Sequence, residues 1–416
     1  MKKLIKWYLH EKVLVYCRNI CFSLEKEDHI LVYNSISGKG YIYNCSPDLL
    51  SFIDQLMLPE NLYCSQVDEE LLRRKSIGEF VISMQSNFCG SLFDVDEFPQ
   101  KPIVAVPDVN IGEDIEGVDN SVFGGNVLRN LTDVFICLTG KCNKNCPDCN
   151  LIYKQMCWCH KSNESLAFEK LEAILKKLEY LNVFELHFTG GNMFLYPYWR
   201  ELLIKLNEIS YKKSFYVHYS QLRGYDEDID HILNLENSVI RILVDFADFD
   251  VENLLLISKS RGPFEYLFKI TSWNEYNEAC DIIERLCLNA KIIPFYNVGN
   301  YSFFEDNVFL NMQDILSTKW TKNEIFANQK LNTNDFGKIR MLENGFVYAN
   351  LNFSPIGKWH DDYREIVYNE LKRGTSWRRT RDSLPVCKEC LCKYLCPSPS
   401  NYELAIGKSN LCHVKS

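Results

Sequence analysis

The segment Cys142-Asn-Lys-Asn-Cys146-Pro-Asp-Cys149 follows closely on the strand-like run Thr132–Leu138. The three cysteines share one loop, which also holds Gly140. Three thiolates on one loop can ligate three irons of a [4Fe–4S] cube, and the fourth iron then stays open to a small molecule. Because loops at the carboxyl ends of parallel strands commonly bind ligands, this stretch predicts both an iron–sulfur site and the kind of sheet that carries it.

A regular alternation of strands and helices surrounds this loop. Strand-like runs lie at 132–138, 183–188, 214–219, 239–245, 266–271 and 291–296. Helical stretches lie at 166–181, 197–209, 226–234, 249–260, 274–289 and 305–317. Successive βα units predict a parallel sheet with right-handed crossovers, and about six units rather than eight favour an incomplete barrel. The expected fold class is therefore α/β, with a partial (βα)6 barrel over residues 131–330.

A structural zinc site is the alternative interpretation of the cysteine loop. Zinc takes four ligands in such sites, and Cys157 or Cys159 could supply the fourth. The βα pattern around the loop favours the iron–sulfur interpretation.

The loop and the surrounding βα pattern resemble the radical S-adenosylmethionine (radical SAM) superfamily over about residues 130–317. The resemblance implies that the cluster at Cys142, Cys146 and Cys149 binds S-adenosylmethionine through its open iron. It also implies reductive cleavage to a 5′-deoxyadenosyl radical, which abstracts a substrate hydrogen. The cofactor carries that chemistry, while the protein supplies binding and orientation. The sequence identifies no catalytic side chain.

Further cofactor-binding positions follow from the same resemblance. Gly190, Gly191 and Asn192 match the Gly-Gly-Glu motif that binds the methionyl amine, with Asn in place of the usual Glu. Ser220, with Gln221 beside it, matches positions that hold the ribose, and Asp245 near the end of the fourth strand is expected to line the site. Ordinary polarity at strand ends is the alternative for all of them.

The loop departs from the family in a second position. The family usually has an aromatic residue before the third cysteine, and this chain has Asp148. Trp158, in Cys157-Trp158-Cys159, is a candidate to replace that aromatic residue.

A second group of cysteines lies near the C-terminus. The cysteines Cys387, Cys390, Cys396 and Cys412 have the spacing C-x2-C-x5-C-x15-C. Four thiolates suffice to close a second [4Fe–4S] cluster. A zinc knuckle is the alternative, because ligand type alone does not separate zinc from iron–sulfur.

The position of this cysteine group, after a barrel and a hairpin, resembles the SPASM (or twitch-like) domain of peptide-modifying radical SAM enzymes. The resemblance implies that the outer auxiliary cluster is kept and the inner one lost. Ala349 and Ser400 stand where inner-cluster cysteines are expected, and Cys392 is the spare cysteine. The string from Cys396-Pro-Ser-Pro-Ser-Asn-Tyr-Glu403 to Cys412 is also similar to the SPASM-type and pseudo-radical-SAM proteins of Bacteroidales peptide systems with Gly-Gly leaders.

Residues 331–416 form the expected C-terminal Cys-rich domain. Within it, Glu343-Asn-Gly345 separates two strand-like runs, Lys338–Leu342 and Phe346–Asn350, and predicts a hairpin. A helix is expected at Tyr363–Arg373.

Residues 1–100 predict a small α+β module, and residues 101–130 a linker. Val13–Tyr16, His29–Tyr33 and Gly40–Tyr43 are strand-like, and a helix is expected to begin at Pro47 with Ser46 as its N-cap. By resemblance to peptide maturases, this module could be a winged-helix-like domain whose strand edge pairs with a leader peptide. A plain structural cap on the barrel is the alternative.

The composition excludes several classes of protein. The chain has 416 residues, 46% of them hydrophobic, and a net charge of −9, so it can form large cores but gives no support for nucleic-acid binding. No apolar run reaches about eighteen residues, and Lys6 and His10 interrupt any signal peptide, so we expect a cytoplasmic protein without a membrane span.

The 18 cysteines are many for a cytoplasmic chain, in which disulfides are rare. Metal binding explains the two clusters better, and the scattered cysteines are expected to be small buried hydrophobes. They are Cys17, Cys21, Cys45, Cys64, Cys89, Cys137, Cys280 and Cys287.

Together these features predict a radical SAM peptide maturase that binds two [4Fe–4S] clusters and S-adenosylmethionine. Its expected partners are a precursor peptide with a Gly-Gly leader and an electron donor. One alternative is a degenerate iron–sulfur relative that assists a second radical SAM maturase. The other is a zinc-binding interaction protein.

Overall fold

The computed structural model describes residues 12–17, 20–24, 29–94 except 62, and 127–414 except 147, 157, 180, 182, 248, 260 and 261. Most of the expected linker, and Cys17, Cys21 and Cys157 as side chains, lie outside these residues.

A nine-stranded sheet forms the body of the molecule, in the order β12-β11-β10-β9-β8-β7-β13-β14-β15. Its first six members are parallel and adjacent in chain order. They are β7 (Asp133–Thr139), β8 (Glu185–Gly190), β9 (Lys212–His218), β10 (Ser238–Val244), β11 (Phe264–Ile270) and β12 (Ala290–Pro294). The predicted α/β fold with a parallel sheet is thereby confirmed.

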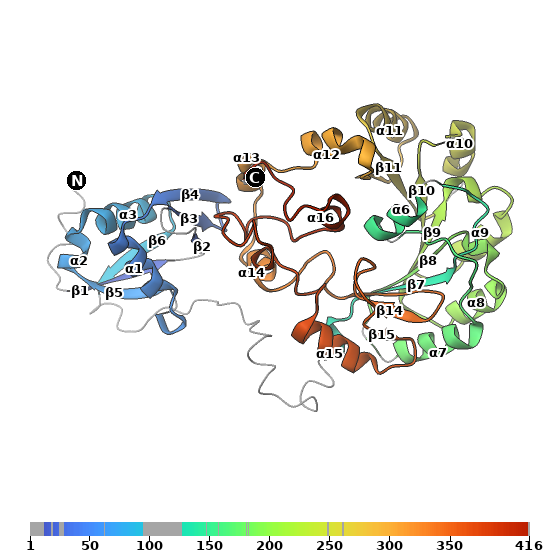
Figure 1. Ribbon diagram of the computed structural model, residues 1–416, viewed down its shortest axis with the longest axis horizontal. Helices are drawn as coiled ribbons and strands as arrows, with labels where there is room; N and C mark the ends of the chain where they lie inside the picture. Colours follow the sequence, from blue (N-terminus) through green and yellow to red (C-terminus); the bar gives the residue numbers. More distant parts are fainter. Residues whose placement is uncertain are drawn as a thin grey trace.

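Helices cover the outer face of the curved sheet (Figure 1). They are α7 (Phe168–Leu178), α8 (Trp199–Leu206), α9 (Asp226–Leu233), α10 (Val251–Lys259) and α11 (Trp273–Leu286). The helix α6 (Cys149–Met156) lies instead on the inner side, next to α16 (Asn401–Ile406). Alternate strand residues decide the two faces. In β7, Val134 and Ile136 point outward into the main core under α7, while Phe135 and Cys137 point inward. The inner face is therefore the one available for a site.

The helix expected at 305–317 is wrong in its extent, because two helices occupy this region. They are α12 (Tyr301–Asn307) and α13 (Met312–Ser317). Asn311 begins the second one with a capping box to Asp314, and Leu310 just before it forms a bridge with Cys412. The helix α14 (Lys322–Lys330) then leads out of the barrel.

The sheet continues beyond residue 330. The strand β13 (Lys338–Met341) pairs in parallel with β7, and β14 (Phe346–Tyr348) returns antiparallel to it as the predicted hairpin. The remaining elements are β15 (Gly357–Lys358), α15 (Tyr363–Arg373) and α16 (Asn401–Ile406). Trp377 is fully buried in the main core. The expected domain boundary at residue 330 therefore does not separate two hydrophobic cores, because the main core contains residues from both sides of it.

The N-terminal residues form two three-stranded antiparallel sheets and three helices. The sheets are β5-β1-β6 and β2-β3-β4, built from β1 (Lys12–Cys17), β2 (Ile20–Leu24), β3 (His29–Asn34), β4 (Lys39–Asn44), β5 (Cys64–Asp68) and β6 (Gly90–Asp94). The helices are α1 (Pro47–Met57), α2 (Glu69–Arg73) and α3 (Lys75–Ser86). Ser46 caps α1 as predicted, since its side chain accepts a hydrogen bond from the Leu49 backbone amide at 3.3 Å.

The strand at His29–Asn34 is central, because β2 and β4 pair with its two sides. It therefore has no free edge for a peptide, and β4 is the better candidate. Tyr33 of β3 bonds through its hydroxyl group to Thr318 and Trp320, so this module contacts the segment between α13 and α14.

Short 3-10 turns complete the described elements. They are η2 (Pro59–Asn61), η3 (Leu128–Asn130), η4 (Met193–Leu195), η5 (Tyr219–Gln221), η6 (Val298–Asn300) and η7 (Arg381–Ser383). None of the helices in the described part of the chain has the length and hydropathy that a bilayer span requires.

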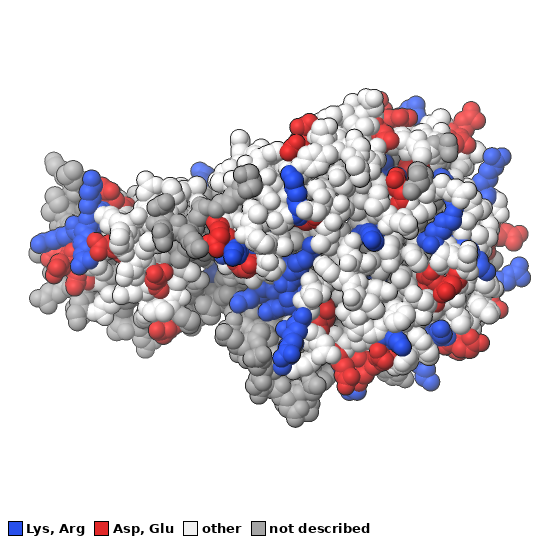
Figure 2. Space-filling view, viewed as in Figure 1, with Lys and Arg blue, Asp and Glu red and all other residues white. Residues whose placement is uncertain are grey.

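The scattered cysteines are only partly as expected. Cys64, Cys89 and Cys137 are buried, but Cys287, the residue after the last turn of α11, is exposed. Charge is also uneven on the surface. Lys and Arg side chains gather over and between α14 and α15 on one face, although the chain is acidic as a whole (Figure 2).

Candidate metal centre

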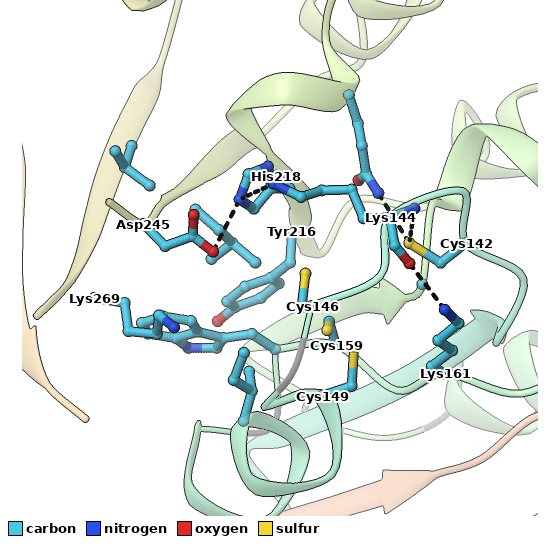
Figure 3. A pocket seen from close by; sticks show the side chains of 16 residues that line it. Cys142, Lys144, Cys146, Cys149, Cys159, Lys161, Tyr216, His218, Asp245 and Lys269 are labelled. Atoms are coloured by element: carbon cyan, nitrogen blue, oxygen red, sulfur yellow. Dashed lines mark hydrogen bonds and ion pairs between the residues drawn. The ribbon is translucent and has the colours of Figure 1, made fainter. Parts of the chain in front are cut away.

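A pocket of about 610 Å³ lies at the carboxyl ends of β7 to β11, on the inner side of the sheet. Cys142, Cys146 and Cys149 line it together (Figure 3). Cys142 and Cys146 lie in the loop after β7, and Cys149 is the first residue of α6. The structure thus brings the three cysteines of the loop to one cavity, at the edge of the sheet where the sequence predicts it.

The backbone at Gly190 and Gly191 packs against the start of the cysteine loop. A Cβ atom at Gly190 would collide with the Thr139 carbonyl group, and one at Gly191 with that of Lys141. Gly191 donates to the Thr139 carbonyl group at 2.7 Å. The two glycines are therefore required for loop packing, and only Gly191 also lines the pocket.

Asn192 is fully buried, and its amide group is used inside the fold. Its side-chain oxygen accepts from the Phe194 amide at 3.2 Å and caps η4, while its Nδ2 donates to Asn143 Oδ1 at 3.5 Å. Its backbone amide binds the Lys141 carbonyl group at 2.7 Å. In this arrangement Asn192 holds the cysteine loop in place and does not line the pocket.

Asp245 lines the pocket, as expected, at the end of β10. Its Oδ2 lies 3.3 Å from His218 Nε2, while its Oδ1 is buried and has no hydrogen-bond partner within the described chain. Burial raises the pKa of this carboxyl group, but His218 outweighs that and keeps the pKa below its usual value. Conversely, burial lowers the pKa of His218. An ionised carboxylate oxygen without a partner suits a ligand that donates a hydrogen bond.

Ser220 and Gln221 differ in their placement. Ser220 is exposed, and its hydroxyl group lies 2.8 Å from His218 Nδ1, outside the pocket lining. Gln221 is buried and donates to Cys142 Sγ at 3.4 Å. Of this pair, therefore, Gln221 is the residue that reaches the cysteine site.

Several pocket residues were not predicted from the sequence. Lys144 Nζ lies 3.4 Å from His218 Nε2, and Lys161 Nζ fixes the loop by donating to the Lys144 carbonyl group at 2.9 Å. Tyr216, a buried residue of β9, forms the apolar wall. Tyr216 and His218 lie two residues apart on β9, so both side chains point to the same, inner face of the sheet. This alternation along the strand is the sequence feature that could have identified both residues.

Asp148 stands before the third cysteine, where the resemblance leads us to expect an aromatic residue. Asp148 lies 3.8 Å from Lys269 as an ion pair. Trp158 lines the pocket and packs with Tyr216, Leu243 and Leu267. Trp158 therefore supplies an aromatic wall to the pocket, as the sequence suggested.

The zinc and iron–sulfur interpretations require different separations between the sulfur atoms. In a tetrahedral zinc site with Zn–S bonds of about 2.3 Å, the sulfur atoms lie roughly 4 Å apart. Within the described part of the chain, the metal-like groups with ligand atoms within 4.8 Å of one another are Cys137-His160-Glu343 and Asp133-Glu185-His187. Cys142, Cys146, Cys149 and Cys159 line one pocket, so the thiols that either a cube or a four-thiolate zinc site would use lie together.

A second pocket, of about 420 Å³, gathers the C-terminal cysteines. Its lining includes Cys387, Cys390, Cys396 and Cys412. Cys392 does not line the pocket, but its thiol is in hydrogen-bond contact with Cys390 and its Sγ lies 3.3 Å from the Met312 sulfur. The four cysteines of the predicted set thus share one cavity, and the expected spare cysteine lies against one of them.

Ala349 and Ser400 stand where inner-cluster cysteines were expected, and the residues that follow them in the sequence are joined by a hydrogen bond. Asn350, next to Ala349, donates to Asn401, next to Ser400, at 2.6 Å. Asn350 also donates to Asp335 at 2.8 Å. A polar network therefore links the hairpin to α16 in this region.

A polar cluster covers the inner face of the sheet at the other end of the strands. His187 Nε2 lies 2.9 Å from Asp133, and Arg241 lies 2.9 Å from both Glu185 and Glu265. The charged groups of this cluster form ion pairs with one another, and these pairs explain their close spacing without a metal ion.

Comparisons with known proteins give a fold but no family. No protein-family model matches the chain, and no curated protein does. A crystal structure of Streptococcus suis SuiB matches with a TM-score of 0.50 at 13% identity, covering 95% of this chain and 98% of that one. A structure described as native anSMEcpe with bound AdoMet matches with a TM-score of 0.36 at 13% identity, covering 57% of this chain and 80% of that one. The likeness to SuiB shows a common fold over nearly the full length of both chains.

Proposed function

We propose that the chain is a radical SAM peptide maturase with one [4Fe–4S] cluster at Cys142, Cys146 and Cys149 and another in the tail. The observation that carries this proposal is the gathering of three loop cysteines in one pocket at the carboxyl ends of parallel strands. The parallel βα sheet around the loop favours a cube over a structural zinc site. When bound, the cluster and S-adenosylmethionine would supply an organic radical that abstracts a hydrogen atom from the substrate.

The residues of the pocket suit S-adenosylmethionine in charge and shape. The unpartnered Oδ1 of Asp245 could accept a hydrogen bond from the methionyl ammonium group or a ribose hydroxyl group. Lys144 could neutralise a carboxylate of the ligand, and Trp158 and Tyr216 offer an apolar wall for the adenine. In this account Asp245 supplies the negative charge that Asn192 lacks.

A third cavity, of about 810 Å³, offers room for a peptide beside this pocket. Trp158 and Tyr216 line both cavities, so the two are neighbours. Its other side is polar and includes Arg340 of β13 and Asn401 of α16. A precursor peptide, with a Gly-Gly leader by the resemblance, would enter here, and the exposed side of β4 could pair with its leader.

A degenerate relative that assists a partner maturase is the second candidate function. It is favoured by Asn192, whose amide group is committed to the fold and brings no charge to a ligand. Such a protein would keep its clusters but release no 5′-deoxyadenosine.

The deciding experiment measures 5′-deoxyadenosine released by the anaerobically reconstituted protein with S-adenosylmethionine and dithionite. We expect release by the wild type, none by Cys146→Ala, and less by Asp245→Asn at equal iron content. Iron-loaded wild-type protein that releases none, with or without a candidate precursor peptide, would overturn the maturase proposal and leave the degenerate relative.

A further inference from the structure

Cys159 is the fourth thiol of the first pocket. It lines the cavity together with the three loop cysteines, although it lies ten residues after Cys149 in the sequence. In Figure 3 its sulfur atom lies between those of Cys146 and Cys149. Its thiol group is in hydrogen-bond contact with that of Cys149.

The segment that carries Cys159 is fixed on both sides of the cysteine. The next residue, His160, lies 3.0 Å through Nδ1 from Glu343, and its ring packs on Tyr153 of α6 at 4.5 Å between centroids. Ser162 donates to the same Glu343 carboxylate, and its backbone amide binds the Gly140 carbonyl group at 2.9 Å. These contacts hold residue 159 at the mouth of the cysteine loop.

Glu343 is the centre of this arrangement. It is buried, with 4% of its surface exposed, and comes from the turn of the β13–β14 hairpin. Burial alone raises the pKa of this carboxyl group, but the hydrogen bonds from His160 and Ser162 outweigh it and bring the pKa to about 2. The hairpin therefore presents an ionised side chain whose partners are the neighbours of Cys159.

We propose that Cys159 is a protein ligand to the fourth iron of the first cluster and closes that iron to outside ligands in the resting protein. The proposal rests on the proposed cluster and deepens it. Three loop cysteines leave one iron without a protein ligand, and among the described residues that line the pocket Cys159 supplies a further thiol. The thiol loses its proton to solvent when it binds iron, and no electron is transferred. S-adenosylmethionine must then displace Cys159 before it can bind.

The alternative role for Cys159 is that of a buried thiol that only packs against Cys149. Its place in a cavity with charged walls argues against this, because Lys161 and Asp245 line the same space.

The test compares wild type, Cys159→Ala and a control, Cys280→Ala on α11, each reconstituted anaerobically as the full chain. Mild ferricyanide oxidation releases an iron that lacks a protein thiolate and leaves a [3Fe–4S] cluster with its own paramagnetic resonance signal. We expect little of this signal from wild type and Cys280→Ala, and an amount comparable to the first cluster from Cys159→Ala. The tail cluster is common to all three proteins and cancels in the comparison.

A second readout is the change that added S-adenosylmethionine makes in the resonance of the reduced cluster. Removing a competing ligand should lower the concentration needed by about tenfold, if the capped form is about 90% of the wild type. If Cys159→Ala fails to fold by circular dichroism, Cys159→Ser keeps a hydrogen-bonding group of similar size and should still give the [3Fe–4S] signal.

Equal [3Fe–4S] signals in wild type and Cys159→Ala would overturn the role of Cys159 while leaving the cluster proposal intact. Absence of iron from the wild-type first pocket would overturn both. A signal confined to Cys159→Ala and Cys159→Ser would establish the fourth ligand, whether or not 5′-deoxyadenosine is released.

Discussion

The two cysteine pockets differ in what surrounds their sulfur atoms. The first is lined by charged groups, among them Lys144, Lys161, Asp245 and Lys269. Beside its cysteines the tail pocket is lined by five aliphatic side chains, and its charged groups are Arg381 and Lys393. The first pocket combines cations with a carboxylate, as a ligand with both charges requires, whereas the charged groups of the tail pocket are both cations. The first pocket is therefore the candidate for chemistry and the second for structure.

Loss of a tail cysteine should have the largest effect on folding. The tail contributes only a few residues to a small core that it shares with β3, α13 and α14, so a group bound by its cysteines would add much to its order. We expect Cys390→Ala to make the segment beyond Trp377 sensitive to protease while β13, β14 and α15 stay protected, because these belong to the main sheet and core.

Cys280→Ala is the control, since Cys280 lies on α11 and lines neither cysteine pocket. Its digestion pattern should match wild type. Identical patterns for Cys390→Ala and wild type would mean that no bound group holds the tail together.

Replacing Arg381 should have the next largest effect, which again concerns the stability of the tail. Its guanidinium group lies 2.9 Å from Glu403 and 3.8 Å from Cys387 Sγ, and both ionic side chains are more than nine-tenths buried. Arg381→Met should lower the free energy of unfolding of the tail by about 3–5 kcal/mol, because it leaves the Glu403 carboxylate buried without its cation.

Tail opening of Arg381→Met can be followed by amide hydrogen exchange of α16, with Arg364→Met as control. Arg364 pairs with Asp362 on the surface and should contribute little. Equal exchange rates in the two variants would show that the buried pair does not stabilise the tail.

The pH dependence of stability tests whether the Glu343 carboxylate supports the first pocket. Its folded pKa of about 2 lies below the usual 4.5, so its stabilising contribution is present above pH 4.5 and is lost as pH falls towards 2. That shift corresponds to about 3 kcal/mol for wild type relative to Glu343→Gln at pH 7, with the difference shrinking to near zero at about pH 2.

Urea unfolding of both proteins between pH 7 and pH 3, followed by Trp fluorescence, measures this difference. A constant difference across the range would mean that the Glu343 charge is not what fixes the segment of His160 and Ser162.

Asn192 gives the smallest expected change. Asn192→Ala removes the cap of η4 and should cost about 1 kcal/mol of stability, whereas Asn192→Asp keeps the oxygen that accepts from Phe194 and should cost less. Thermal unfolding of the two variants checks this order. The reverse order would show that Asn192 stabilises the loop through Asn143 instead.

Much of the sheet was predictable because short apolar strand-like runs alternate regularly with amphipathic helical stretches along the sequence. The cysteine positions were predictable because metal ligands cluster in sequence. The rest depends on contacts between distant segments. Glu343 looked like a turn residue, yet it is buried against His160, 183 positions away. Asn192 looked like a ligand-binding residue, yet the Gly190–Gly191 backbone and the cysteine loop turn its amide group inward.

The most direct test of the two-pocket account is the iron content of anaerobically reconstituted protein. Two [4Fe–4S] clusters predict about eight irons per wild-type chain, with an equal amount of sulfide, and about four in the variant with Cys142, Cys146 and Cys149 all replaced by Ala. Cys280→Ala should keep the wild-type value. A wild-type content of about four irons that the triple replacement leaves unchanged, or zinc bound in place of iron, would contradict the account.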